Sequence, residues 1–315
     1  MDNMKKVLIM VPCSTDMQEN LIKRFEDKYD FVFAYGDHAL IEKWLPNVEI
    51  IIGEPDEEQI SLAQNLKWIQ LTWAGTDKYD RMTNLPSDIC ITNASGAFGK
   101  IISEYAVGSI ISIYRSFPKY WASKKDKLWE RQDTATTIFG KTALVLGTGD
   151  IGKNVAHRIK AFDCNVLGIK RDINIKPLAD FDQLFKMDDL ESVLPKADMV
   201  IGCLPNNEGT VGKLDYDRLS LMKKDAVIVN VGRGSLIKTD DLIRKLQEGH
   251  LKGAALDVFE VEPLPEDSPL WDMENVMITP HISGPSFGGN KDVEHTIWNI
   301  CINNLEMYLE GDLKK

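Results

Sequence analysis

The turn after residues 143–146 limits the fold of this chain more than any other feature. Three glycines stand there in the spacing Gly147-x-Gly149-x-x-Gly152, between an apolar strand pattern and a helical pattern. The first glycine permits the tight turn, the second lets backbone N–H groups approach a pyrophosphate, and the third lets the helix pack on the strand. An ordinary glycine-rich turn is the alternative, but the preceding strand favours a dinucleotide-binding unit.

Size, charge and cysteine content narrow the class of protein. A chain of 315 residues with 43% apolar content suits two domains. The net charge of −11 argues against nonspecific nucleic-acid binding. The five cysteines are scattered without a C-x-x-C pair, so we expect neither disulfides nor a metal site. No apolar run approaches the roughly 20 residues that span a bilayer, and we expect a cytoplasmic protein with no membrane partner.

Short apolar runs bounded by turn residues predict two parallel sheets. One set lies in the N-terminal part and a second follows a helical pattern over residues 103–116. Helical stretches separate the strands, which is typical of doubly wound α/β folds. The expected strands are residues 6–11, 31–35, 50–53, 68–72 and 90–92 in the first sheet, and six in the second at 142–147, 165–169, 199–204, 226–231, 253–258 and 276–279.

The C-terminal segment predicts how the two domains are divided along the chain. Residues 293–309 have the apolar spacing of an amphipathic helix, which we expect to return to the first domain. We therefore expect two Rossmann-like domains with a cleft between them. Residues 1–97 and 284–315 would form the smaller, discontinuous, flavodoxin-like substrate domain, and residues 98–283 the dinucleotide-binding domain.

Three polar motifs stand at the ends of consecutive predicted strands of the second sheet. They contain Asn230-x-x-Arg233-Gly234, Asp257-Val-Phe-Glu-x-Glu262-Pro-Leu-Pro and Pro280-His281. Ligands of open α/β sheets bind at the carboxyl ends of the strands, so we expect these side chains to converge on a cofactor. Each has a plainer explanation when taken singly: a loop histidine, an arginine that ties a turn, and a Glu-Pro pair that ends an element.

Together with the glycine turn, these motifs are similar to those of the D-isomer-specific 2-hydroxyacid dehydrogenases over nearly the whole chain. Within that family, the Gly99-Lys-Ile-Ile-Ser-Glu104-Tyr-Ala-Val segment most resembles glyoxylate/hydroxypyruvate reductases. The resemblance implies an oxidoreductase that acts on CH-OH donors and transfers a hydride between NAD(P)H and C2 of a small anionic 2-keto acid, giving the D-2-hydroxy acid. It also implies a homodimer formed through the cofactor domain.

The catalytic roles implied by the resemblance agree with the chemistry of the side chains. His281 would deliver the proton, because imidazole titrates near neutral pH and a carboxylate neighbour such as Glu262 favours and orients its charged form. Arg233 would bind the substrate carboxylate and polarise the keto oxygen through its planar donor fork.

The first domain is expected to supply further substrate contacts. Ala74, Gly75 and Thr76 match the family's carboxylate loop, in which successive backbone N–H groups can form an anion-binding nest. The family usually has Val where Thr76 stands, but a backbone contact tolerates that change. Trp73 and Phe98 are expected to line the pocket and favour small substrates, although such aromatics are often core residues.

The cofactor is predicted to be NADP, with NAD as the alternative. At the end of the second Rossmann strand, NAD-specific members place an acid that binds the ribose 2′-OH, whereas this chain has Lys170 and Arg171. These cations could pair with a 2′-phosphate, unless both face solvent and Asp172 binds the ribose. The other expected cofactor contacts are Gly147, Thr148, Gly149, Asp150, Ile151, Gly152, Leu204, Pro205, Thr210, Val231, Asp257 and His281.

Two alternatives to a glyoxylate/hydroxypyruvate reductase remain open. One is a D-lactate-type or other D-2-hydroxyacid dehydrogenase; a long phosphoglycerate dehydrogenase is less expected, since no regulatory domain follows Lys315. The other is a nucleotide-sensing interaction protein on the same scaffold, against which the Arg233, Glu262 and His281 set argues.

Overall fold

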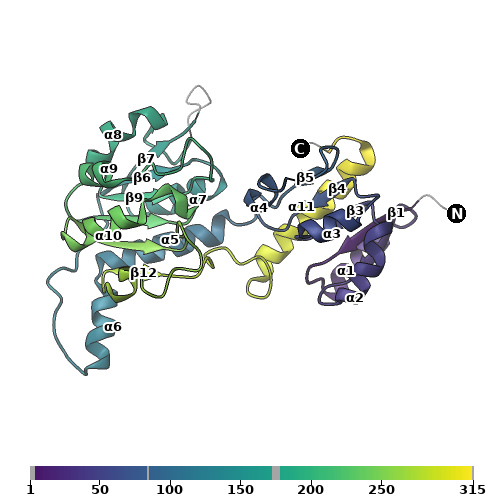
Figure 1. Ribbon diagram of the computed structural model, residues 1–315. Coiled ribbons are helices and arrows are strands. Elements are labelled where there is room, and N and C mark those ends of the chain that lie inside the picture. Colours follow the sequence, from purple (N-terminus) through teal and green to yellow (C-terminus); the bar gives the residue numbers. More distant parts are fainter. Residues whose placement is uncertain (1–3, 84, 172–177, 314–315) are drawn as a thin grey trace. The chain divides into compact units, whose positions relative to one another are not determined.

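The computed structural model describes residues 4–83, 85–171 and 178–313. The chain divides into two compact units (Figure 1). Unit 1 comprises Met1–Ala97 and Pro285–Lys315, and unit 2 comprises Phe98–Gly284. Both contain a parallel sheet with helices between successive strands, which confirms the prediction of two doubly wound α/β sheets.

Unit 1 contains a five-stranded parallel sheet in the order β2-β1-β3-β4-β5. The central strand β3 is an unbroken Ile-Ile-Ile run that is buried completely, as expected for a parallel strand covered on both faces. The strands are β1 (Lys5–Ile9), β2 (Tyr29–Phe33), β3 (Ile50–Ile52), β4 (Trp68–Gln70) and β5 (Cys90–Thr92).

The last helix of the chain, α11 (Lys291–Glu310), packs on the sheet of unit 1. Trp298, Cys301 and Leu305 lie on its buried face, and the Tyr29 hydroxyl donates to the Leu305 carbonyl at 2.8 Å. This packing explains why unit 1 needs both ends of the chain. The other helices of the unit are α1 (Thr15–Arg24), α2 (His38–Trp44), α3 (Glu57–Leu62) and α4 (Asp77–Asp80).

Unit 2 contains a seven-stranded parallel sheet in the order β12-β11-β10-β9-β6-β7-β8. The expected number of six strands is wrong, because β8 (Gln183–Phe185) pairs with β7 at the edge of the sheet. This strand contains only two apolar residues and is not buried, so it gives no apolar run in the sequence. The others are β6 (Thr142–Leu146), β7 (Asn165–Ile169), β9 (Met199–Gly202), β10 (Ala226–Asn230), β11 (Leu251–Leu256) and β12 (Val276–Ile278).

The helices of unit 2 cover both faces of this sheet (Figure 1). The first, α5 (Gly99–Tyr114), begins four residues before the expected position, because the Asp150 carboxylate accepts the Gly99 N–H at 2.8 Å. The second, α6 (Phe117–Lys125), projects away from the sheet (Figure 1). The others are α7 (Asp150–Lys160), α8 (Leu190–Val193), α9 (Tyr216–Leu221) and α10 (Thr239–Gln247).

The order of connections defines one ligand-binding edge in unit 2. The chain runs from β6 outward through β7 and β8, then crosses to β9 and continues to β12. A ligand crevice is expected at the carboxyl ends of β6 and β9, where the direction reverses. Within the described ranges, no helix is both long and apolar enough to span a bilayer.

Candidate active site

The glycine turn at the carboxyl end of β6 has the shape that a pyrophosphate requires. Gly147 has φ +100°, and a Cβ there would lie 2.8 Å from the Cys203 carbonyl oxygen. A Cβ on Gly152 would lie 1.9 Å from the Gly147 oxygen. At Gly149, by contrast, a Cβ would meet no atom within 4 Å, and this residue caps α7 without a side-chain hydrogen bond. The helix N-terminus therefore opens onto free space, where its N–H groups and dipole favour an anion.

The predicted ribose residues follow β7. The Lys170 backbone N–H donates to the Phe185 carbonyl at 2.9 Å, which fixes the backbone where the strand ends. The Lys170 side chain is partly buried and Arg171 is exposed. The alternative ribose ligand, Asp172, lies outside the described residues.

Two predicted cofactor neighbours have structural roles that the sequence motifs did not reveal. The carboxylate of Asp150 is engaged by the Gly99 N–H and by the Asn154 side chain. The Thr210 hydroxyl donates to the Pro205 carbonyl at 2.6 Å and so shapes the loop after β9. Around them, Thr148 and Val231 are buried, Ile151 and Leu204 are partly buried, and Pro205 is exposed.

Arg233 stands three residues beyond β10, in a turn that Asn230 stabilises. The Asn230 side chain is buried, donates to the Arg233 carbonyl at 3.0 Å and accepts the Gly232 N–H at 3.2 Å. Gly234 is required next to the arginine, because a Cβ there would lie 1.9 Å from the Phe259 backbone. The Asn230-x-x-Arg233-Gly234 motif is therefore a built turn that presents a guanidinium at the carboxyl end of the strand.

His281 and Glu262 form a hydrogen-bonded pair. His281 Nδ1 lies 2.9 Å from Glu262 Oε2, and the backbone N–H of Phe259 donates to Glu262 Oε1 at 2.9 Å. The side chains are 50% and 37% exposed, so a substrate can reach the ring. Because β10, β11 and β12 are neighbours in the sheet, Arg233, Glu262 and His281 follow three adjacent strands at the same edge.

Asp257 holds the loop that carries His281. Its Oδ1 accepts the Thr279 hydroxyl at 2.6 Å and the Ile282 N–H at 2.8 Å, and its Oδ2 accepts the Ser283 N–H at 3.0 Å. This buried carboxylate compensates for the left-handed backbone of His281, whose φ is +55°. The sequence motif marked Asp257 as a cofactor contact, but only the structure reveals this second role.

A hydroxyl chain extends the same network to α5. The Tyr105 hydroxyl lies 2.7 Å from Thr279 Oγ1, which in turn donates to Asp257. Burial raises the pKa of Tyr105, so the phenol stays protonated and serves as the donor. Phe98 caps the start of the same helix and is buried, whereas it was expected to line a pocket.

A second candidate loop lies at the carboxyl end of the sheet in unit 1. Trp73, Ala74, Gly75 and Thr76 follow β4, and the Trp73 side chain is half exposed. The loop is anchored by the Ala94 N–H, which donates to the Trp73 carbonyl at 2.8 Å. Within the described parts of the chain, no group accepts the backbone N–H of Ala74, Gly75 or Thr76.

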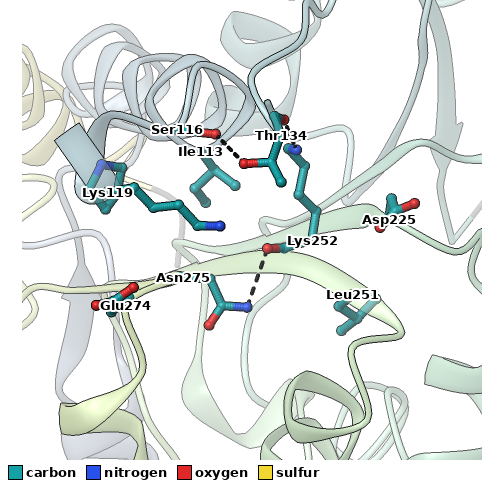
Figure 2. Close-up of a pocket in the computed structure, with 10 residues that line it drawn as sticks. Ile113, Ser116, Lys119, Thr134, Asp225, Leu251, Lys252, Glu274 and Asn275 are labelled. Carbon is teal, nitrogen blue, oxygen red and sulfur yellow. Dashed lines mark hydrogen bonds between the residues drawn. The ribbon is translucent and has the colours of Figure 1, made fainter. Parts of the chain in front are cut away.

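A pocket of about 290 Å³ lies at the opposite, amino-terminal edge of the sheet in unit 2 (Figure 2). Leu251, Lys252 and Asn275 line it from β11 and the turn before β12, and Lys252 Nζ donates to the Thr134 carbonyl at 2.5 Å. It shares no lining residue with the glycine turn, Arg233 or His281. We therefore assign the chemistry to the carboxyl edge.

Comparison with known proteins identifies the family. Residues 107–283 match the model of the D-isomer specific 2-hydroxyacid dehydrogenase NAD-binding domain. A glyoxylate/hydroxypyruvate reductase of Arabidopsis thaliana is 30% identical over 97% of this chain and 96% of its own length. These matches confirm the family, the oxidoreductase class and the NAD(P) cofactor that the motifs predicted.

Two solved structures extend the similarity to the whole fold. A D-isomer specific 2-hydroxyacid dehydrogenase family protein from Aeromonas salmonicida has a TM-score of 0.87 and 32% identity, with 98% of this chain and 97% of that chain covered. A probable 2-hydroxyacid dehydrogenase from Rhizobium etli, in complex with NADP, HEPES and L(+)-tartaric acid, has a TM-score of 0.78 and 28% identity, with 98% and 97% covered.

Proposed function

Because this chain belongs to the D-isomer specific 2-hydroxyacid dehydrogenase family, we propose that it is an NADPH-dependent reductase of a small 2-keto acid such as glyoxylate or hydroxypyruvate. Its product would be the corresponding D-2-hydroxy acid. The observation that carries this proposal is the hydrogen-bonded His281–Glu262 pair. It lies at the carboxyl edge of the sheet in unit 2, where Arg233 and the glycine turn also lie.

His281 is the proton donor for the C2 oxygen. Its Nδ1 is paired with Glu262, so Nε2 is the ring nitrogen that remains to hold the transferred proton. The Glu262 carboxylate stabilises the imidazolium, and the bond from the Phe259 N–H keeps that carboxylate in place. The nicotinamide, when bound, supplies the hydride for C2.

Each unit contains groups suited to bind a carboxylate. In unit 2, the Arg233 fork pairs with the carboxylate and polarises the keto oxygen. In unit 1, the backbone N–H groups of Ala74, Gly75 and Thr76 form an anion nest. The bulk of Trp73 restricts the substrate to small side chains, with Phe98 as a further determinant of size.

The preference for NADP rests on the end of β7. Lys170 and Arg171 stand where an acid would repel a 2′-phosphate, and the exposed Arg171 side chain is available to pair with one. A 28% identical relative that covers almost the whole chain was crystallised with NADP. The remaining neighbours of the glycine turn, Thr148, Ile151, Leu204, Pro205, Thr210 and Val231, are proposed to enclose the dinucleotide.

We also propose a homodimer that forms through α6 and the segment after it. This region carries an exposed apolar surface, and Lys124, Lys125 and Lys127 give it a positive charge on a chain whose net charge is −11. Introducing Glu at Trp121 and Trp129 should halve the mass in sedimentation velocity. The exposed apolar residues are Phe117, Tyr120, Trp121, Leu128, Trp129 and Phe139.

We propose a cytoplasmic location because the cysteine thiols are free. All five cysteines are free, and burial raises the pKa of the Cys203 thiol to about 12. Free thiols without disulfide partners, two of them buried at Cys164 and Cys301, suit a reducing compartment.

A panel of 2-keto acids tests the substrate class. Glyoxylate, hydroxypyruvate, pyruvate and oxaloacetate are offered with NADPH, and the chirality of each chiral product is determined. Fastest turnover of glyoxylate or hydroxypyruvate supports the proposal. A preference for pyruvate would indicate the D-lactate-type alternative, and an L-product would contradict the assigned stereochemistry. Tight NADPH binding without turnover of any member would indicate a nucleotide sensor.

A further inference from the structure

Glu54 is a largely buried carboxylate that the mechanism above does not use. It follows β3, and its Oε1 accepts both the backbone N–H of Thr72 at 2.7 Å and the Thr72 hydroxyl at 2.8 Å. The nearby backbone N–H of Trp73 also stabilises the charged form of the same carboxylate and lowers its pKa. Glu54 therefore interacts with the two residues with which the loop after β4 begins.

The surroundings of Glu54 are less favourable for an ionised carboxylate than water is. Burial raises the pKa of Glu54 despite the hydrogen bonds from Thr72 and Trp73, so the carboxylate costs more free energy here than in water. Lys78 on α4 offsets part of this cost, and its Nζ also donates to the Pro55 carbonyl at 3.1 Å. The two hydrogen bonds from Thr72 point to a role of Glu54 in positioning the loop.

The hydrogen bonds to Glu54 determine which way the loop backbone faces. The N–H groups of Thr72 and Trp73 turn toward the carboxylate, whereas those of Ala74, Gly75 and Thr76 meet no acceptor within the described ranges. Because Glu54 accepts hydrogen bonds only at the start of the loop, the N–H groups of the three following residues remain available to bind an anion. A neutral amide could still accept both bonds from Thr72 at its single oxygen, but without the negative charge that strengthens them, and its other polar atom is a donor.

We propose that Glu54 is a positioning residue that orients the loop of Trp73, Ala74, Gly75 and Thr76 for the substrate carboxylate. The inference rests on the proposed function, since it concerns the same anion nest. Glu54 contacts the loop and acts on the keto acid only through it, so it should influence binding of the carboxylate far more than hydride or proton transfer.

Glu54→Gln tests this role in the full-length enzyme with NADPH and the keto acid that wild type turns over fastest. We expect KM for the keto acid to rise by about 5- to 10-fold, because the hydrogen bonds from Thr72 lose the charge of their acceptor. kcat should change by less than about 3-fold, and the Kd of NADPH should remain unchanged. Glu58→Gln, which neutralises an exposed acid on α3, should leave KM as in wild type.

Thr72→Val is a second variant that keeps the carboxylate and removes only the hydroxyl donor. A smaller rise in KM, of roughly 3-fold, is expected with the same split between KM and kcat. If either variant lost NADPH binding or its folded circular dichroism spectrum, the other would still give the answer.

The possible outcomes separate this inference from the proposed function. A KM for Glu54→Gln that equals or falls below that of wild type would overturn the inference and leave the enzyme assignment intact. Equal losses in kcat and KM would also overturn it, since they would indicate general damage to the site. Absence of turnover by wild type on every keto acid would instead refute the proposed function.

Discussion

His281 Nδ1 lies 2.9 Å from Glu262 Oε2, while the other oxygen of Glu262 accepts the backbone N–H of Phe259. One oxygen of Glu262 is thus fixed by the backbone, and the other oxygen fixes the orientation of the imidazole ring. With Nδ1 committed, the ring can turn only Nε2 toward a substrate.

Glu262→Gln should lower kcat by about 10-fold without abolishing activity. The amide can still orient the ring, but it removes the negative charge that stabilises the imidazolium, and partial exposure limits the loss. Glu266→Gln, an exposed position in the same segment, is the control in steady-state assays. Equal kcat in wild type and Glu262→Gln would show that the pair has no catalytic role.

Arg233→Ala should raise KM for the keto acid and lower kcat, because the guanidinium binds the carboxylate and stabilises charge that develops on the C2 oxygen. Arg233→Lys should restore only part of the loss, since an ammonium cannot reproduce the bidentate fork. Steady-state kinetics on both variants would check this. If the alanine variant kept both constants, Arg233 would only stabilise the turn that Asn230 closes.

Arg171→Ala should weaken NADPH much more than NADH. A charge-assisted hydrogen bond to the 2′-phosphate contributes on the order of 1.5 to 3 kcal/mol, so the ratio of the two dissociation constants should change by roughly 10-fold or more. Fluorescence titration with both cofactors measures it. Lys224→Ala, at the amino end of β10, is the control. Tighter binding of NADH than NADPH by wild type would contradict the NADP preference.

Glu54→Gln should become more stable relative to wild type as the pH rises. The folded state raises the pKa of Glu54 above its ordinary 4.5, so folding favours the protonated form and wild type loses stability as the pH increases through the folded pKa. Tyr79 on α4 and Cys301 on α11 also face this carboxylate, but burial raises the pKa of each far above that window. Thermal midpoints between about pH 4.5 and 8 measure the difference. A constant difference would show that burial does not penalise the charge.

The sequence motifs predicted the fold, and they predicted that Arg233, Glu262 and His281 follow strands of one sheet, because each motif combines a strand pattern with a local turn. Gly147, Arg233 and His281 all follow strands of one sheet, so the edge rule for parallel sheets brings them together without knowledge of side-chain packing. The edge strand β8 was missed because Gln183–Phe185 contains only two apolar residues and is not buried, so it gives no apolar run like that of the equally short β3.

The supporting residues could not be predicted in the same way. Asp257 engages residues more than 20 positions away in the chain, and Glu54 engages Thr72 across 18 positions. Such contacts depend on which loops the fold places side by side. For the same reason, Asp150 was recognised by its place in the glycine motif, although its carboxylate holds the start of α5.

The rate of NADPH oxidation with glyoxylate, compared between wild type and His281→Gln, tests the proposed mechanism most directly. Loss of a general acid should lower kcat by about 100- to 10,000-fold while the Kd of NADPH stays unchanged. His157→Gln is the matched control, because His157 Nδ1 pairs with Asp180 at 3.3 Å on the surface of unit 2, and it should retain full activity. Turnover by His281→Gln at the wild-type rate would contradict the assignment of His281 as the proton donor.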